Sequence, residues 1–376
     1  MTVAWGSVRA AGVMAGTTIG AGMFALPYVF DRAGWLLGAA YVFAAVISVT
    51  AIHYLYFRAL ETVGERNRLL GLVRNTFGNT GFYPAFFVVV VGLLLALVVY
   101  LILGTEFLRV VMPQLDGGYA LFLFWAASSL PLLLGLRGLA KIEIFGALIM
   151  GAIILAIFFF SLTAAAPARE FFQPREIFLP FGPVLFALAG WTAVEPIYEL
   201  ISSGPRTRRG ALIALLGAGT LAAAVLYFLF IEGALRLSLP SVSPDGISAL
   251  LRLPDWGKQG AGLLGLFAIW TSFVPIGLEV ANELEKDMKL PKVVGLSVVV
   301  AVPLALVLLG LDNFIRAIGL AGGIFLGLQY VCIIAIGARI VPMNRISRLF
   351  FGALGIMFLL AAAYEIHYFV IARTPS

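Results

Sequence analysis

Charged residues are the scarcest class in this sequence. Asp, Glu, Lys and Arg together make up 12% of its 376 residues, whereas 62% are hydrophobic and the mean hydropathy is +1.04. A soluble globular chain has about 25% charged residues and roughly 45–50% apolar ones. So few charges could not cover the surface of a water-soluble enzyme of this length, and the composition excludes that class.

Cysteine and histidine are nearly absent as well. The one cysteine, Cys332, has no internal partner for a disulfide. His53 and His367 lie at opposite ends of the chain without a second ligand at metal-site spacing, so haem or zinc chemistry is not expected. The sequence also lacks the ATP-binding pattern GxxxxGK(S/T) and a nucleophile–base pair. We therefore expect a protein that is not an enzyme and that carries no cofactor.

Long apolar runs are what the sequence has in abundance. A run of about 18–20 residues is long enough to cross a bilayer as a helix. Charges and Gly or Pro breaks divide the chain into eleven such runs, so we predict an all-α polytopic membrane protein with 11 transmembrane helices. The predicted spans are residues 6–30, 34–58, 81–112, 118–136, 140–163, 179–202, 210–235, 259–284, 292–310, 317–338 and 347–371. Residues 61–79 are predicted to form a short amphipathic helix on the membrane surface.

Basic residues are distributed unevenly among the loops. Most Lys and Arg residues fall on one side of the membrane if the N-terminus is cytoplasmic. This bias accounts for the net charge of +6 without nucleic-acid binding, and it predicts a cytoplasmic N-terminus and an external C-terminus in the plasma (inner) membrane. A cleavable signal sequence is not apparent, so the first helix is expected to be retained.

The predicted spans fall into two blocks of nearly equal length. Spans 1–5 cover residues 6–163 and spans 6–10 cover residues 179–338, while span 11, residues 347–371, lies outside both blocks. Because five is an odd number, the second block must be inverted in the membrane. We interpret residues 1–376 as a single transporter domain with a 5+5 inverted repeat and one extra helix.

The first span of each block is the most interrupted one. Span 1 contains the glycine-rich stretch 16–22, and span 6 contains Gly190 between two prolines, Pro183 and Pro196. Broken helices at matching positions of inverted repeats are the best sequence pointer to the binding site of a transporter. The alternative is that the small residues only allow helices to pack closely.

These breaks offer complementary chemistry. Unwinding of the first break would free the amides of Ala21 and Gly22 at the start of a half-helix, which favours an anion such as a carboxylate. Unwinding near residues 187–190 would expose carbonyl oxygens that accept from an ammonium group, and the two sites together describe an α-amino acid. Tyr100 and Trp191 are predicted to cover or stack on the substrate, unless they are core or lipid-facing. The predicted substrate-binding residues are Thr17, Thr18, Gly20, Ala21, Gly22, Tyr100, Ala187, Ala189, Gly190 and Trp191.

Two segments resemble a known family. GTTIGAGMFALP, from Gly16 to Pro27, resembles the first-helix signature of the bacterial hydroxy- and aromatic-amino-acid permeases. These belong to the amino acid/polyamine/organocation superfamily, which has the leucine-transporter fold of five plus five inverted helices. PIYEL, from Pro196 to Leu200, is similar to the related amino acid/auxin permease branch. The resemblance implies amino acid transport by alternating access, with the substrate carboxylate on span 1 and the amine on span 6.

Span 8 carries a polar pair in an otherwise apolar helix. In sodium-coupled relatives, a small residue followed by an adjacent Thr/Ser pair on this helix binds sodium together with two span-1 carbonyls. The resemblance therefore implies a sodium site formed by Gly16, Ile19, Ala268, Thr271 and Ser272. Oxygen ligands suit a hard cation. The alternative is that the two hydroxyls bond back to carbonyls of their own helix.

Acidic residues inside spans are costly and mark functional sites. Glu195 follows the span-6 break, and Glu279 lies in the predicted cytoplasmic half of span 8. We predict that Arg9, in span 1, pairs with one of them and closes an inner gate, or that a buried Glu195 carries a proton. Glu199 and Glu283 are predicted to be solvated at the inner membrane interface.

The sequence as a whole predicts a symporter of α-amino acids, neutral or aromatic, driven by a sodium or proton gradient. Its expected partners are a small-molecule substrate and the lipid bilayer, without nucleic acid. An inorganic-ion transporter of this fold is disfavoured, because the Asp-Pro-Gly break in span 1 and the Met/His pair in span 6 of the metal transporters are missing. A transporter-fold sensor that binds an amino acid without moving it stays open, as do the amino acid, the coupling ion and the oligomeric state.

Overall fold

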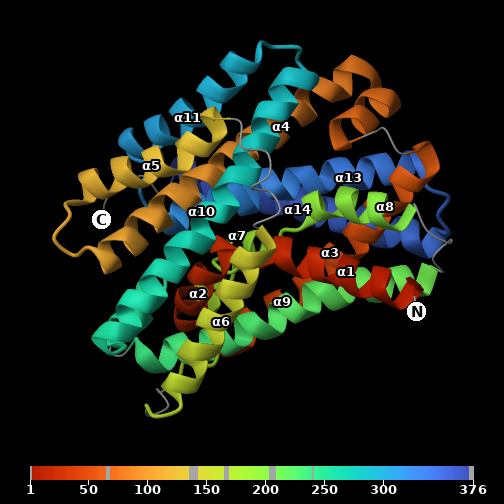
Figure 1. Ribbon diagram of the computed structural model, residues 1–376. Helices are drawn as coiled ribbons and strands as arrows, with labels where there is room; N and C mark the ends of the chain where they lie inside the picture. The colour runs from red at the N-terminus through yellow and green to blue at the C-terminus, as the bar shows by residue number, and fades with distance from the viewer. Residues whose placement is uncertain are drawn as a thin grey trace.

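The computed structural model describes residues 2–64, 68–134, 143–164, 169–202, 209–238 and 241–371, and within these ranges the protein is helical, without strands (Figure 1). The side chains of residues 2–9, 143–145, 202, 209 and 368–371 are not part of this description. Arg9, the predicted gate residue, is among them, so its side chain lies outside the described residues.

The helices follow the predicted spans closely. In chain order they are α1 (Thr2–Thr18), η1 (Ala21–Ala25), α2 (Leu26–Ala33), α3 (Trp35–Val63), α4 (Leu69–Val111), α5 (Gly117–Leu133), α6 (Glu143–Ser161), η3 (Pro174–Glu176), α7 (Phe181–Ala187), η4 (Trp191–Ala193), α8 (Val194–Ser202), α9 (Arg209–Leu237), η5 (Ile247–Arg252), α10 (Asp255–Lys286), α11 (Lys292–Leu308), α12 (Phe314–Ile318), the π-helix η6 (Gly319–Leu326), α13 (Gly327–Ile340) and α14 (Arg345–Ile371).

The predicted surface helix over residues 61–79 is divided in the structure. Helix α3 continues to Val63, and a new helix begins at Leu69 as the first part of α4. Gly78 then interrupts α4 with φ +66°, a conformation that glycine adopts without the steric cost of a side chain. A short helix therefore does precede the long one, but it starts later than the sequence predicted.

The lengths of the helices fit a membrane protein. Seven of the described helices are long and apolar enough to cross a bilayer, and the bent pair Ala10–Thr18 and Ala21–Ala33, at 47°, makes eight. Three shorter apolar helices, Gly117–Leu133, Gly146–Ser161 and Lys292–Leu308, lie at other predicted spans. The count of 11 crossings and the inverted relation of the two blocks stay predictions.

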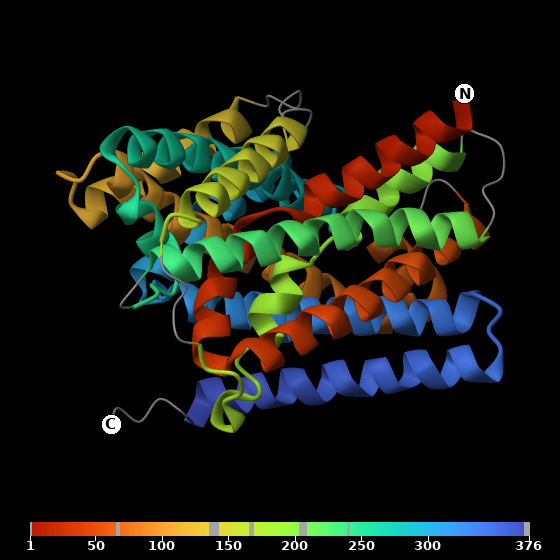
Figure 2. The same cartoon turned by 90° about the horizontal axis from the view of Figure 1, so that it is seen from below.

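The broken helices lie among the long ones. Helix α9 packs along both α1 and α6, α10 packs along α4, and α7 packs on η6. Figure 2 shows α9 in green beside the red α1, and α13 and α14 in blue as an adjacent pair at the far edge. The two breaks are therefore held between long, regular helices.

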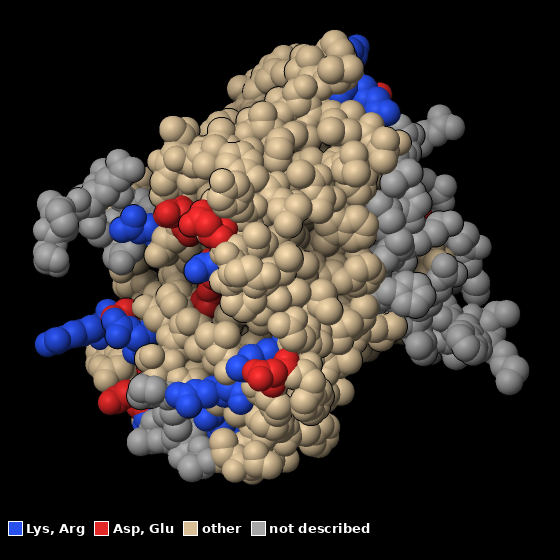
Figure 3. Space-filling model, turned by 60° about the vertical axis from the view of Figure 1, so that its left-hand side comes forward, with Lys and Arg blue, Asp and Glu red and all other residues tan. Residues whose placement is uncertain are grey.

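The outer surface is mostly uncharged. Figure 3 shows acidic and basic side chains gathered in a few places, with wide uncharged areas between them. Large apolar side chains such as Phe43, Tyr119 and Leu309 are exposed. Extensive exposed apolar surface marks contact with a membrane or a partner, and this surface fits a protein surrounded by lipid.

Candidate functional site

The first break is centred on Gly20. The amide of Ile19 still donates to the carbonyl of Ala15 at 2.9 Å, as in a helix, and Gly20 is extended, with φ −151° and ψ −162°. Helix η1 then begins at Ala21. The first amides of a helical segment have no intrahelical acceptor, and those of Ala21 and Gly22 donate to no backbone carbonyl among the described residues.

The second break lies between Ala187 and Trp191. Helix α7 ends at Ala187, and Gly190 is neither helical nor extended, with φ −163° and ψ 11°, before η4 begins. Two carbonyls in this stretch already have donors: that of Ala187 accepts from the Tyr227 hydroxyl at 2.8 Å, and that of Gly190 accepts from the Ala193 amide at 3.0 Å. Among the described residues, the carbonyls of residues 188 and 189 between them accept from no backbone amide.

The two breaks are in direct contact. A Cβ atom added to Gly22 would overlap with the backbone of Ala187, so only glycine lets the two segments approach this closely. The Tyr227 hydroxyl on α9 lies 2.6 Å from the carbonyl oxygen of Thr18 and 2.8 Å from that of Ala187, and so joins both breaks. Tyr227 was not predicted, although a phenol within an apolar span is a visible signal.

A cavity of about 530 Å³ opens beside both breaks. Small-molecule sites are typically clefts of roughly 300–1,000 Å³. Most of the predicted substrate-binding residues line it: Thr17, Thr18, Gly20, Ala21, Gly22, Tyr100, Ala189, Gly190 and Trp191. Ala187 is buried behind this lining, and the hydroxyl of Thr18 donates to the Met14 carbonyl at 2.8 Å.

Trp191 is held in place by a neighbour that the sequence analysis missed. Its indole Nε1 donates to Oε1 of Gln329 at 2.7 Å, and Nε2 of Gln329 donates to the Val88 carbonyl at 3.3 Å. Gln329 is buried and lines the same cavity. A side-chain amide inside an apolar span is costly to bury unless it is hydrogen-bonded. The presence of a glutamine in an apolar run was therefore the feature of the sequence that could have pointed to Gln329.

One end of the cavity holds a cluster of charged residues, which we call the Arg68 cluster: Arg68, Glu195, Glu279 and Glu283. Nη1 of Arg68 lies 3.1 Å from Glu279 Oε1 and 4.0 Å from Glu283 Oε1, and Nε lies 3.8 Å from Glu195 Oε2. Glu195 also accepts from the Tyr56 hydroxyl at 2.5 Å and from the Leu69 amide at 3.3 Å. Glu195 and Glu279 therefore both face Arg68, which the sequence analysis did not single out, while the side chain of the predicted partner, Arg9, lies outside the described residues.

Arg68 precedes α4, outside the apolar span. Burial lowers the pKa of its guanidinium, but the carboxylates of Glu279, Glu195 and Glu283 outweigh burial, and the pKa is raised above its usual value. Arg68 is therefore a permanent cation at this end of the cavity.

Glu283 differs from the sequence prediction. It was expected to be solvated, but it is only 4% exposed, because α10 places it on the face that turns toward Arg68 and α4. Glu199 lines the cavity and is exposed.

The candidate sodium ligands on α10 bond to their own helix. The hydroxyls of Thr271 and Ser272 both donate to the Ala268 carbonyl, at 2.9 and 3.1 Å. Thr271 also lies against Gly146 of α6, and Gly16 lies against the next residue, Ala147. The same stretch of α6 therefore neighbours both the α1 residue Gly16 and the α10 residue Thr271 of the predicted sodium site. The two hydroxyls bond to a carbonyl of their own helix, which is the alternative that the sequence left open.

Three buried phenylalanines pack together near the end of α4. Phe24 packs edge-to-face on Phe107 and on Phe230, with ring centroids 5.1 and 5.3 Å apart, and all three are buried. Phe107 lies near the end of α4 that is remote from Arg68. We call these three residues the aromatic cluster.

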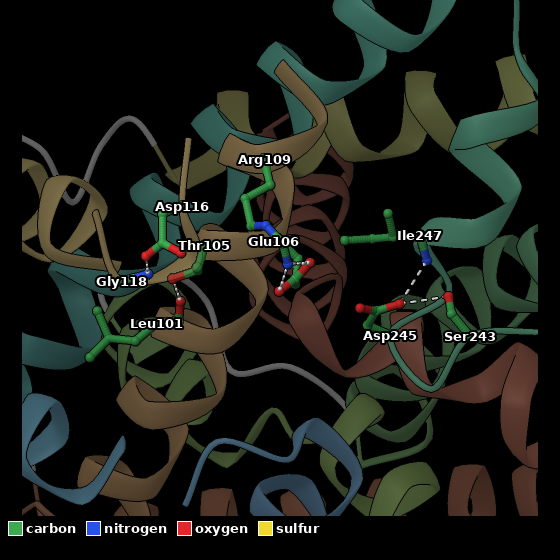
Figure 4. A network of polar contacts seen from close by, with 9 residues as sticks. All are labelled: Leu101, Thr105, Glu106, Arg109, Asp116, Gly118, Ser243, Asp245 and Ile247. Atoms are coloured by element: carbon green, nitrogen blue, oxygen red, sulfur yellow. Dashed lines mark hydrogen bonds and ion pairs between the residues drawn. The ribbon is translucent and has the colours of Figure 1, made fainter. Parts of the chain in front are cut away.

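A short loop covers the aromatic cluster. Gly246 adopts φ +66°, and a Cβ atom there would come within 2.7 Å of the Phe24 carbonyl oxygen. Asp245 shapes the loop by accepting from the Ser243 hydroxyl at 2.6 Å and from the Ile247 amide at 3.1 Å (Figure 4). The loop thus closes onto η1 directly after the first break.

Solved structures with the same fold are transporters. The chain is similar to a manganese transporter of Eremococcus coleocola (14% identity, TM-score 0.68, covering 98% of this chain and 88% of that one). It is also similar to MhsT in complex with L-phenylalanine (14%, 0.68, 95% and 98%) and to Mhp1, a nucleobase-cation-symport-1 family transporter, in a closed conformation with bromovinylhydantoin bound (13%, 0.61, 96% and 91%). No curated protein sequence gives a match.

Two broken helices meet at a cavity in a chain that shares the leucine-transporter fold with these proteins. A family model described as transmembrane amino acid transporter protein matches residues 5–230, which is more than half of the chain. The chain belongs to this amino acid transporter family, as the sequence resemblance implied, and it is therefore a transport protein and not an enzyme.

Proposed function

We propose that the protein is a symporter of neutral or aromatic α-amino acids that works by alternating access. The observation that carries this proposal is the meeting of the two breaks at one cavity, where amides from η1 and carbonyls from the second break face the same space. Such a site binds the part that all α-amino acids share.

The substrate would lie between the two breaks. Its carboxylate would accept from the amides of Ala21 and Gly22, and its ammonium group would donate to the carbonyls of residues 188 and 189. Its side chain would then extend toward Tyr100 and Trp191, which line the cavity. Two large aromatic walls suit an apolar or aromatic side chain, and MhsT, which shares the fold, was solved with L-phenylalanine.

The Arg68 cluster would be the inner gate. With a cytoplasmic N-terminus and an external C-terminus in the plasma membrane, 11 spans place Arg68 on the cytoplasmic side and the aromatic cluster on the outside. In this arrangement residues 6–163 and 179–338 form the inverted repeats. Opening of the gate would exchange the ion pairs of Arg68 for water.

The coupling ion would be sodium or a proton. A sodium ion would be held by carbonyls of Gly16, Ile19 and Ala268 and by the hydroxyls of Thr271 and Ser272, after the two hydroxyls turn away from the Ala268 carbonyl. A proton would be carried by the Arg68 cluster, for which Glu195 is the candidate from the sequence.

Uptake of a radiolabelled amino acid panel into proteoliposomes, under a sodium or a proton gradient applied separately, tests the proposal. We expect gradient-driven accumulation of neutral or aromatic amino acids. Sodium-driven uptake that is lost in Thr271→Ala supports the sodium site. The matched control is Thr163→Ala, whose exposed hydroxyl likewise donates to a carbonyl of its own helix, that of Phe160.

Two alternatives have distinct outcomes in the same assay. Binding of amino acids without flux under either gradient would identify a sensor and overturn the symporter. Transport of a divalent metal ion in place of amino acids would favour the inorganic-ion reading, which the fold shared with a manganese transporter keeps open. Among the described residues, no group of three or more His, Cys, Asp or Glu is placed to hold a metal ion.

A further inference from the structure

Glu283 has a carboxyl oxygen without a hydrogen-bond partner in the part of the chain that the structure describes. The residue is 4% exposed, and its Oε2 atom is buried without a hydrogen-bond partner among the described residues. Its other oxygen, Oε1, is 4.0 Å from Arg68 Nη1, at the limit of an ion pair. A buried carboxylate normally has several hydrogen-bond donors around it, and Glu283 does not.

The other two acids of the Arg68 cluster are well accommodated as carboxylates. Glu195 accepts from the Tyr56 hydroxyl and the Leu69 amide and lies 3.8 Å from the guanidinium. Glu279 forms the closest ion pair, at 3.1 Å from Arg68. One guanidinium thus faces three carboxyl groups, and Glu283 is the one left without an adequate partner.

Among the described residues, the remaining groups around Glu283 do not supply a positive charge for it. Asp287, four residues further along the chain, is a further acid beside its side chain and adds negative charge there. Arg74 of α4 turns to the Asp287 carbonyl, at 3.1 Å, and to the Phe82 ring, at 3.6 Å. The titratable and charged groups near Glu283 are Glu279 and Asp287 at the end of α10, Arg68 and Arg74 at the start of α4, Glu195 on α8 and Tyr56 on α3.

An ionised carboxylate without a partner is far more costly to bury than a neutral carboxylic acid. We propose that Glu283 binds a proton while the Arg68 cluster is assembled, and that it releases this proton when the gate opens. This inference rests on the proposed transport function and assigns the proton to Glu283, in place of Glu195.

The proton step is simple. When Arg68 moves away from Glu279 and Glu283, water reaches the Glu283 carboxyl. The O–H bond breaks, the proton passes to water, and a solvated carboxylate remains. Reassembly of the cluster requires the carboxylate to take up a proton again. This proton comes from the external side through the cavity, which reaches Glu279 beside it, so each transport cycle takes up one proton outside and releases one inside together with the substrate.

Infrared spectroscopy of the purified full-length protein tests the site directly. We expect the carbonyl stretch of a protonated carboxyl group, absent in Glu283→Gln and kept in the control Glu61→Gln, which removes a surface carboxyl paired with Arg58. We also expect the unfolding temperature of the wild type to fall as the pH rises, since the proton then leaves, with a smaller dependence in Glu283→Gln. A band that persists unchanged in Glu283→Gln overturns the proposal.

Proton movement in proteoliposomes tests the role of the site. With a pH-sensitive dye inside the vesicles, the wild type should move protons together with the amino acid. In Glu283→Gln the ratio of protons moved to amino acid moved should fall by more than about tenfold, whatever the rate of substrate exchange that the variant retains. Proton movement equal to that of the wild type overturns the proposal.

Two further results keep the outcome clear. Should Glu283→Gln fail to fold, Glu283→Asp keeps a carboxyl group and should keep the infrared band; loss of the band in a folded Glu283→Asp protein contradicts the proton site. A wild-type protein that shows the band but neither binds nor moves an amino acid would disprove the proposed function and leave the proton on Glu283 in place.

Discussion

At the start of α4 a guanidinium stands within 4.0 Å of three carboxyl groups, and near the other end of α4 three phenylalanines pack edge-to-face. The charged end can separate into water, because each ion that leaves a partner regains hydration. The aromatic end has no such compensation, since its rings gain from packing with one another and from exclusion of water. The comparison teaches that the Arg68 cluster is suited to open by solvation, whereas the aromatic cluster is suited to move as a packed unit.

The largest effect is expected for Phe107→Ala. Removal of a buried phenylalanine costs about 3–5 kcal/mol of the free energy of unfolding, and Phe107 also fills the space against Gly265. Thermal unfolding in detergent should show the loss, with Phe43→Ala, a 64% exposed ring, as the control. Equal unfolding temperatures for the two variants would show that the aromatic cluster is not a packed unit.

Arg68→Ala should have the next largest effect. It leaves Glu195, Glu279 and Glu283 without their cation. Removal of one partner of a buried ion pair lowers the free energy of unfolding by about 3–5 kcal/mol. We expect the lower value, about 3 kcal/mol, because the Arg68 side chain is 40% exposed. Uptake should fall roughly 100-fold. The control Arg58→Ala removes a surface pair with Glu61 and should leave uptake nearly unchanged. Similar uptake in both variants would remove the Arg68 cluster from the gate.

A smaller effect is expected for Tyr56→Phe. The variant removes the hydroxyl that donates to Glu195 at 2.5 Å and keeps the buried ring. A hydrogen bond to a charged group contributes about 1.5–3 kcal/mol, so uptake should fall roughly tenfold. Tyr83→Phe, at an exposed tyrosine, is the control. If Tyr56→Phe transports like the wild type, the ion pair alone orients Glu195.

Gly246→Ala should have the smallest effect. Positive φ costs an alanine about 1–2 kcal/mol, and the added Cβ atom would also approach the Phe24 carbonyl. Gly310→Ala is the matched control, because Gly310 has φ +102° and open space around it. The difference in unfolding temperature between the variants measures the contact of the loop with the aromatic cluster; a difference of zero would show that the loop does not press on it.

The features set by local sequence were predictable. Apolar runs located the helices, and α11 begins at Lys292 as predicted; glycine and proline located both breaks, where Gly20 and Gly190 leave the helix. Nine of the ten predicted substrate-binding residues line one cavity, although no measurement yet tests their role.

Partners distant in sequence were not predictable. Arg68 and Glu279 are 211 residues apart, and Tyr227 is 209 residues from Thr18. Periodicity reports which face of a helix is apolar, but it carries no information on which faces meet. The hydroxyls of Thr271 and Ser272 could not be assigned from the sequence for a different reason. The same oxygen atoms can coordinate an ion or bond to a carbonyl of their own helix, and only the three-dimensional geometry decides between the two.

The position of Tyr227 has an evolutionary consequence. One hydroxyl contacts a carbonyl of each broken helix, so a substitution that shifts either break also changes the geometry at the other. Among homologues that keep this tyrosine, changes near Thr18 and near Ala187 should therefore occur together. Among homologues with phenylalanine at the position of Tyr227, changes at the two breaks should occur independently of each other.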